Sequence, residues 1–107
     1  YDERQYALAQ KEFQISVQTL PSVWGYSGLG LTHWAQGDET GAERFFGDAI
    51  KVDPTDGRPY ALLGILYARA GRVSDAIREY QQALKVEPGN AIARAQLAVL
   101  ERNGTNK

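Results

Sequence analysis

Apolar and small residues recur three or four positions apart along much of the chain, which is the spacing of one face of an α-helix. The run with i, i+3, i+4, i+7 spacing is Tyr60, Leu63, Gly64 and Tyr67. The run with i, i+4, i+7, i+8 spacing is Ala76, Tyr80, Ala83 and Leu84. Each run predicts an amphipathic helix, and together they predict a pair of helices.

This helix pair occurs twice, because the pattern returns when the sequence is shifted by 34 residues. The identical matches include Tyr26 with Tyr60, Leu29 with Leu63, Gly30 with Gly64, Gly37 with Gly71, Ala42 with Ala76, and Pro54 with Pro88. The small residues among them, glycine on the first helix and alanine on the second, allow the two helices to approach closely. A larger side chain there is expected to force the pair apart.

Residues that typically end or begin helices stand at the boundaries that the two-helix pattern predicts. Gly37 and Gly71 stand where the first helix of each pair should end, since glycine is favoured just past a helix C-terminus. The second helix begins near Asp38 in one pair and near Ser74 in the other. It ends before a proline in both pairs, because proline cannot continue the hydrogen-bond ladder.

The order aromatic, Leu-Gly, aromatic, Gly, then Ala, aromatic, Ala, Pro at a 34-residue period resembles the tetratricopeptide repeat. Two complete units match, and the flanks resemble partial units, with Ala9, Phe13, Ser16 and Pro21 at second-helix positions. We divide the single domain 1–107 into 1–22 (second helix of a truncated repeat, over 2–19), 23–56 and 57–90 (complete repeats), 91–104 (a capping helix, over 91–102) and 105–107 (tail). The resemblance implies an all-α solenoid of about six antiparallel helices, stacked as a right-handed superhelix with a concave binding groove.

Composition narrows the function classes. The 107 residues contain 12 Lys and Arg against 13 Asp and Glu, and a net charge of −1 offers no basic field for nucleic acid. No cysteine and a single histidine exclude disulfides and thiolate or multi-histidine metal sites. No apolar run reaches the roughly 20 residues of a membrane span, so we expect no membrane insertion. The chain begins at Tyr1 without any methionine, so we interpret it as an excerpt or a processed product, from which the compartment cannot be inferred.

Several features resemble catalytic or cofactor signals but have structural interpretations. The glycines between Gly25 and Gly30 lie inside a predicted helix rather than between a strand and a helix, so we expect packing positions and not a phosphate loop. His33 stands on the core-facing side, where we expect a hydrogen-bonded structural residue. The loop acids Asp53, Asp56 and Glu87 fit turn and cap chemistry. We therefore predict no catalytic residue, no cofactor and no metal site.

First-helix positions outside the repeat core are the candidate peptide-binding residues. They are Trp24, Ser27, Leu31, Trp34, Arg58, Ala61, Ile65, Arg69 and Val99. Two interpretations stay open: Trp24, Leu31 and Trp34 either pack on neighbouring helices or form an apolar groove floor with arginines at its rim. Ser27, Leu31, Ala61 and Ile65 replace the lysine and asparagine of the family's two-carboxylate clamp, so the resemblance argues against a chaperone-adaptor role.

These features predict a non-catalytic module that binds a protein or peptide partner in its concave groove. The alternative is a regulatory or substrate-recruiting appendage of a larger enzyme, for example a peptidase or glycosyltransferase, whose catalytic domain lies outside these residues. Because the N-terminal helix has no predicted first helix to cover Tyr6, Phe13 and Val17, we also expect a concentration-dependent homodimer or a swapped helix at that end.

Overall fold

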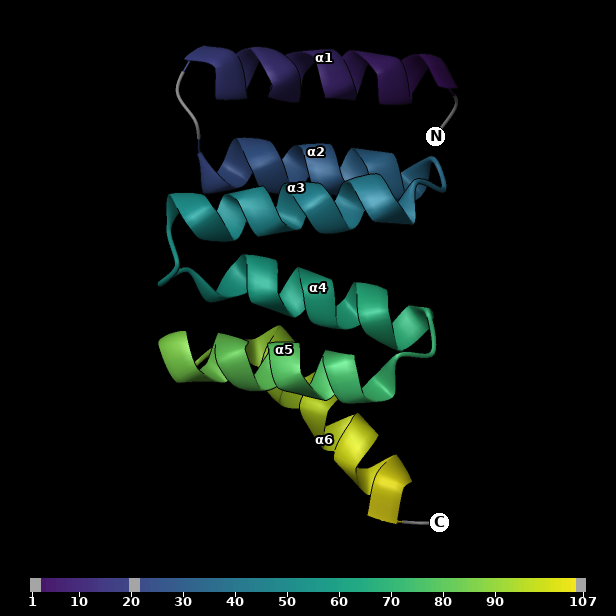
Figure 1. Ribbon diagram of the computed structural model, residues 1–107, viewed down its shortest axis with the longest axis vertical. Coiled ribbons are helices and arrows are strands. Elements are labelled where there is room, and N and C mark those ends of the chain that lie inside the picture. Colours follow the sequence, from purple (N-terminus) through teal and green to yellow (C-terminus); the bar gives the residue numbers. More distant parts are fainter. Residues whose placement is uncertain (1–2, 20–21, 106–107) are drawn as a thin grey trace. The chain divides into compact units, whose positions relative to one another are not determined.

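The computed structural model describes residues 3–19 and 22–105, with side chains described for 3–15 and 22–102. The described residues form six helices and no strand, so the predicted all-α class and helix count are confirmed (Figure 1). The helices are α1 (Glu3–Thr19), α2 (Val23–Ala35), α3 (Glu39–Val52), α4 (Gly57–Arg69), α5 (Val73–Val86) and α6 (Ala91–Thr105). They group into two compact units that divide between Pro54 and Thr55.

The predicted glycine stops close α2 and α4 with the same geometry. Gly37 and Gly71 have φ of 89° and 82°, a left-handed conformation that costs glycine little. In unit 1 the Gly37 amide donates to the Trp34 carbonyl at 2.9 Å and the Asp38 amide donates to the His33 carbonyl at 2.8 Å. This pair of bonds is a Schellman cap, and it satisfies carbonyls that the end of a helix leaves without partners.

Short polar side chains begin most of the helices. The Ser22 hydroxyl accepts from the Gly25 amide at 2.9 Å at the start of α2, and Asp38 accepts from the Gly41 amide at 2.9 Å at the start of α3. Asn90, which is 6% exposed, accepts from the Ala93 amide at 2.9 Å before α6. For α5 the cap position is Arg72, which makes no side-chain cap bond, and Ser74 lies inside the first turn.

In unit 1, α2 and α3 pack as a close antiparallel pair beside α1 (Figure 1). Phe46 of α3 is fully buried and its ring lies over Gly30 of α2, where a Cβ atom would come within 2.5 Å of the ring. Ala42 and Ala49, one turn either side of Phe46, are also fully buried. The glycine therefore serves helix packing, as the sequence predicts.

The same α2 helix also receives an aromatic ring from α1. A Cβ added at Gly28 would overlap the ring of Phe13. Gly28 and Gly30 therefore face different neighbours, α1 and α3, and each provides the gap that one ring occupies. These two glycines of α2 therefore occupy packing positions inside a helix, as the sequence predicts.

In unit 2, Tyr80 of α5 occupies the place over Gly64 of α4 that Phe46 occupies over Gly30. The buried core of this unit is Ala61, Ala76, Tyr80, Ala83 and Ala93. Helix α6 packs on α5 and also reaches α4. It ends at Thr105 rather than near residue 102, so the Asn103-Gly104 pair does not stop it.

The repeat boundaries and the right-handed superhelix stay predictions. The sequence assigns second-helix positions to Ser16 and Pro21 and predicts that Val17 is partly uncovered. These three residues lie outside the part of the chain whose side chains are described.

Candidate functional site

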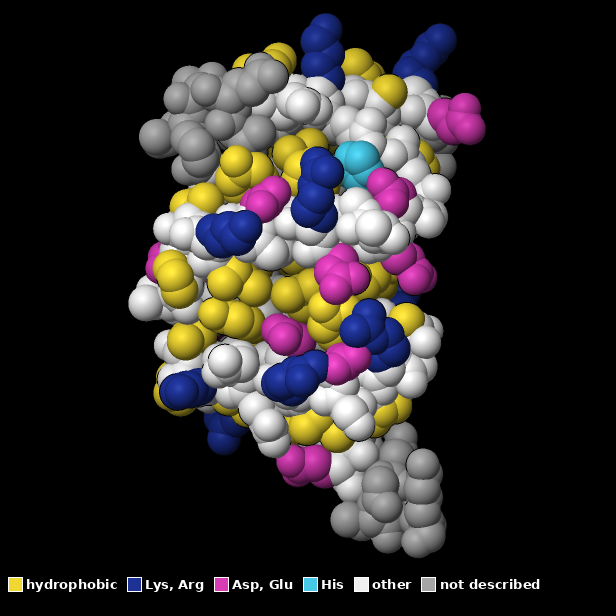
Figure 2. All heavy atoms as spheres, viewed as in Figure 1, with side chains coloured by type: hydrophobic (Ala, Val, Ile, Leu, Met, Phe, Trp, Pro, Cys, Tyr) yellow, Lys and Arg dark blue, Asp and Glu magenta, His cyan; other side chains and the backbone are white. Residues whose placement is uncertain are grey.

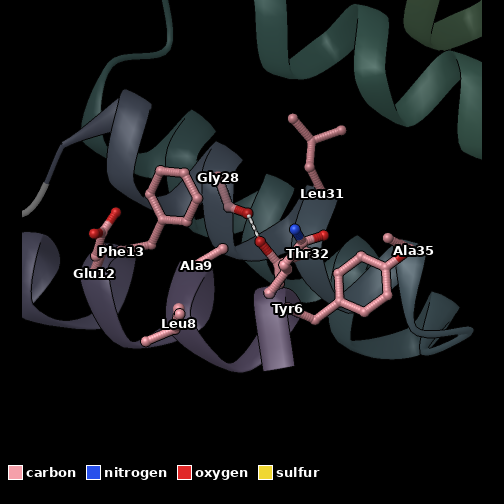
Figure 3. Close-up of a pocket in the computed structure, with 10 residues that line it drawn as sticks. Tyr6, Leu8, Ala9, Glu12, Phe13, Gly28, Leu31, Thr32 and Ala35 are labelled. Carbon is pink, nitrogen blue, oxygen red and sulfur yellow. Dashed lines mark hydrogen bonds between the residues drawn. The ribbon is translucent and has the colours of Figure 1, made fainter. Parts of the chain in front are cut away.

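An open, mainly apolar pocket of about 520 Å³ lies between α1 and α2 in unit 1 (Figure 3). Its volume falls within the range of ordinary small-ligand and peptide side-chain pockets, roughly 300–1,000 Å³. The lining residues are Gln5, Tyr6, Leu8, Ala9, Glu12 and Phe13 from α1, and Gly28, Leu31, Thr32 and Ala35 from α2. In Figure 3 the rings of Phe13 and Tyr6 lie on either side of Ala9 and Thr32.

The pocket follows from the spacing of residues along two helices. On α1 the lining positions recur every three or four residues, and on α2 they fall one turn apart, so each helix turns one face towards the gap. Alanine at positions 9 and 35 leaves the gap open, since neither side chain is long enough to fill it, whereas the ring of Phe13 occupies the space beside Gly28. The Thr32 hydroxyl donates to the Gly28 carbonyl at 2.7 Å, so its polar group is already satisfied.

Two predicted binding residues in unit 1 are accessible. Leu31 is 44% exposed and lines the pocket. Trp24 is 61% exposed, and its ring meets that of Phe13 edge-on with centroids 4.8 Å apart. These two side chains add an exposed apolar strip on α2 beside the pocket.

The other two predicted residues of unit 1 face inward. Trp34 is half-buried and its ring lies edge-on to the buried Phe46, with centroids 6.5 Å apart. The Ser27 hydroxyl is buried and makes no hydrogen bond among the described residues. For Trp34, packing against its own hairpin is therefore the better of the two interpretations that the sequence left open.

The predicted residues of unit 2 have mixed environments. Ala61 is 2% exposed within the core, so the expectation that it contacts a ligand is wrong: the methyl group packs with Tyr80 and Ala93 instead. Ile65 is half-buried against the same core. Arg69 is exposed, and Val99 is 44% exposed.

Arg58 is exposed but its guanidinium is engaged by Asp56. Its Nε donates to the Asp56 carboxylate at 2.9 Å, and the same carboxylate accepts the Arg58 backbone amide at 3.0 Å. The guanidinium bonds hold the pKa of Asp56 below its ordinary value. Asp56 thus caps α4, as the loop-acid interpretation predicts.

His33 has the structural role that the sequence predicts. Its Nδ1 lies 2.9 Å from Asp38 Oδ2, and its ring lies 5.0 Å from the Phe45 ring, centroid to centroid. The Gly41 amide and then His33 lower the pKa of Asp38. On the face shown in Figure 2, positively and negatively charged side chains are interspersed.

Sequence reasoning marked Tyr6 and Phe13 as partly uncovered, and both line the pocket. It missed Leu8 and Glu12 on α1 and Ala35 on α2. No single-residue signal in the sequence marks them: the structure alone shows that Leu8, although large and apolar, is 58% exposed. The described part of the chain contains no cluster of three or more potential metal ligands and no helix long and apolar enough to span a membrane.

Two helix pairs, each packed through a glycine against an aromatic ring, make this chain an all-helical repeat protein. Its pocket between α1 and α2 is an exposed apolar surface of the kind that binds partners. A family model described as "Tetratricopeptide repeat" matches residues 33–100. That match covers more than half of the chain, so the chain belongs to the tetratricopeptide repeat family, and the resemblance read from the sequence is confirmed.

Individual relatives come from several kinds of protein. A protein O-mannosyl-transferase of Caenorhabditis elegans is 33% identical over 93 residues, covering 83% of this chain and 14% of that protein. The probable UDP-N-acetylglucosamine--peptide N-acetylglucosaminyltransferase SPINDLY of Solanum lycopersicum is 34% identical over 74% of this chain and 8% of its own length. Superkiller protein 3 of Saccharomyces cerevisiae is 27% identical over 66% of this chain and 5% of its own length. The chain therefore spans only 5–14% of these three relatives.

Proposed function

We propose that this chain is a non-catalytic protein-interaction module that binds an apolar peptide segment of a partner protein. The observation that carries the proposal is the pocket between α1 and α2, continuous with the exposed Leu31 on its rim. Family membership supports the general role, because stacked helical repeats offer extended binding surfaces rather than catalytic groups. The contribution of Arg69 and Val99 to binding stays part of the proposal, whereas Ala61 is withdrawn from it.

The energetics favour weak binding. Covering a large apolar side chain releases about 1.5–3 kcal/mol, so Leu8, Leu31 and Trp24 together offer roughly 5–9 kcal/mol before any cost. Association takes back about 4 kcal/mol or more in lost translational and rotational freedom. We therefore expect micromolar or weaker dissociation constants for this chain alone.

A second candidate is that the module recruits substrate or regulates a larger enzyme that contains it. The observation in its favour is that two of the relatives are named as glycosyl-transferring enzymes and match over 83% and 74% of this chain. The sequence of the parent reading frame tests this candidate: a transferase or peptidase domain beside these residues supports it, and a reading frame of repeats alone rejects it.

The binding proposal is tested by selecting from a random peptide library displayed on phage, and by measuring the anisotropy of selected, labelled peptides against purified chain. Leu31→Ser is expected to weaken binding at least tenfold, because it removes the apolar rim of the pocket. The matched control is Val73→Ser on α5, where the side chain is equally exposed at 45% but lies outside the pocket. Selected peptides that bind both variants equally well refute the assignment.

A further inference from the structure

We draw no further inference here: the strongest candidate, the apolar pocket between α1 and α2, belongs to the site already described, and nothing in the described part of the chain shows what covers its open side.

Discussion

Replacing glycine by alanine should have opposite effects at two positions in the same hairpin. Gly47 lies inside α3, and a Cβ built there has no atom within 4 Å. Gly30 lies inside α2, and a Cβ built there lies 2.5, 2.7 and 3.1 Å from three ring atoms of Phe46. Because both residues lie inside helices, alanine gains the same helix propensity at each position. The difference between the two variants in the free energy of unfolding therefore measures the contact of residue 30 with the Phe46 ring.

The magnitudes follow from these two environments. Alanine stabilises a helix interior by about 1 kcal/mol relative to glycine, so Gly47→Ala is expected to raise the free energy of unfolding by that amount. Gly30→Ala gains the same 1 kcal/mol but overpacks a ring that is fully buried and cannot move aside, at a cost of about 3 kcal/mol. The net loss is about 2 kcal/mol, which corresponds to a fall in Tm of roughly 8 °C, against a rise of roughly 4 °C for Gly47→Ala.

Thermal unfolding followed by circular dichroism at 222 nm, with urea titrations for the free energies, measures both changes. Gly28→Ala provides an intermediate case, because its Cβ meets the half-buried ring of Phe13, which has space in the pocket to move. The expected order of stability is Gly47→Ala above the unsubstituted chain, then Gly28→Ala, then Gly30→Ala. A Gly30→Ala variant as stable as Gly47→Ala would refute the claim that this glycine is required by the ring.

Three other predictions concern a cap, an ion pair and the tryptophans. Gly71→Ala, where φ is 82° and the space is open, should cost about 1–2 kcal/mol in urea titrations from backbone strain alone. Because the Gly41 amide and His33 hold the pKa of Asp38 below 3.8, its contribution to stability is present above that pH and disappears as the pH falls through the lowered pKa. The Tm of Asp38→Asn should therefore fall less steeply on acidification below about pH 4 than that of the unsubstituted chain. Trp34→Ala should lower the free energy of unfolding by about 2 kcal/mol and Trp24→Ala by less than about 1, and the reverse order in denaturant titrations would contradict their assigned environments.

Much of the fold was predictable because its signals are local. The left-handed caps at Gly37 and Gly71 follow from where the apolar period stops, and the contacts of Gly30 and Gly64 follow from a pattern that occurs twice. The role of His33 was also predictable, since a polar cap residue, Asp38, lies five positions away. Each of these inferences uses residues within a single hairpin, and the hairpin repeats.

The candidate site was less predictable because it depends on a third helix. Ala61 occupies a position that appears exposed when only its own hairpin is considered, but it lies in one core with Ala93 of α6. Trp34 has the same ambiguity, and its edge-on contact with Phe46 becomes visible only in the packed hairpin. Leu8 and Glu12 gave no signal as single residues, and they form a pocket only because α2 lies beside α1 at a separation that Gly28 permits.

The sequence by itself therefore determined the class of protein, the helices, their caps and the glycines that allow close packing, because periodicity and turn chemistry act over a few neighbouring residues. Only the tertiary structure decided which faces of those helices stay open to a partner. Exposure depends on which other helices cover a face, and that is a property of the packed molecule rather than of any one segment.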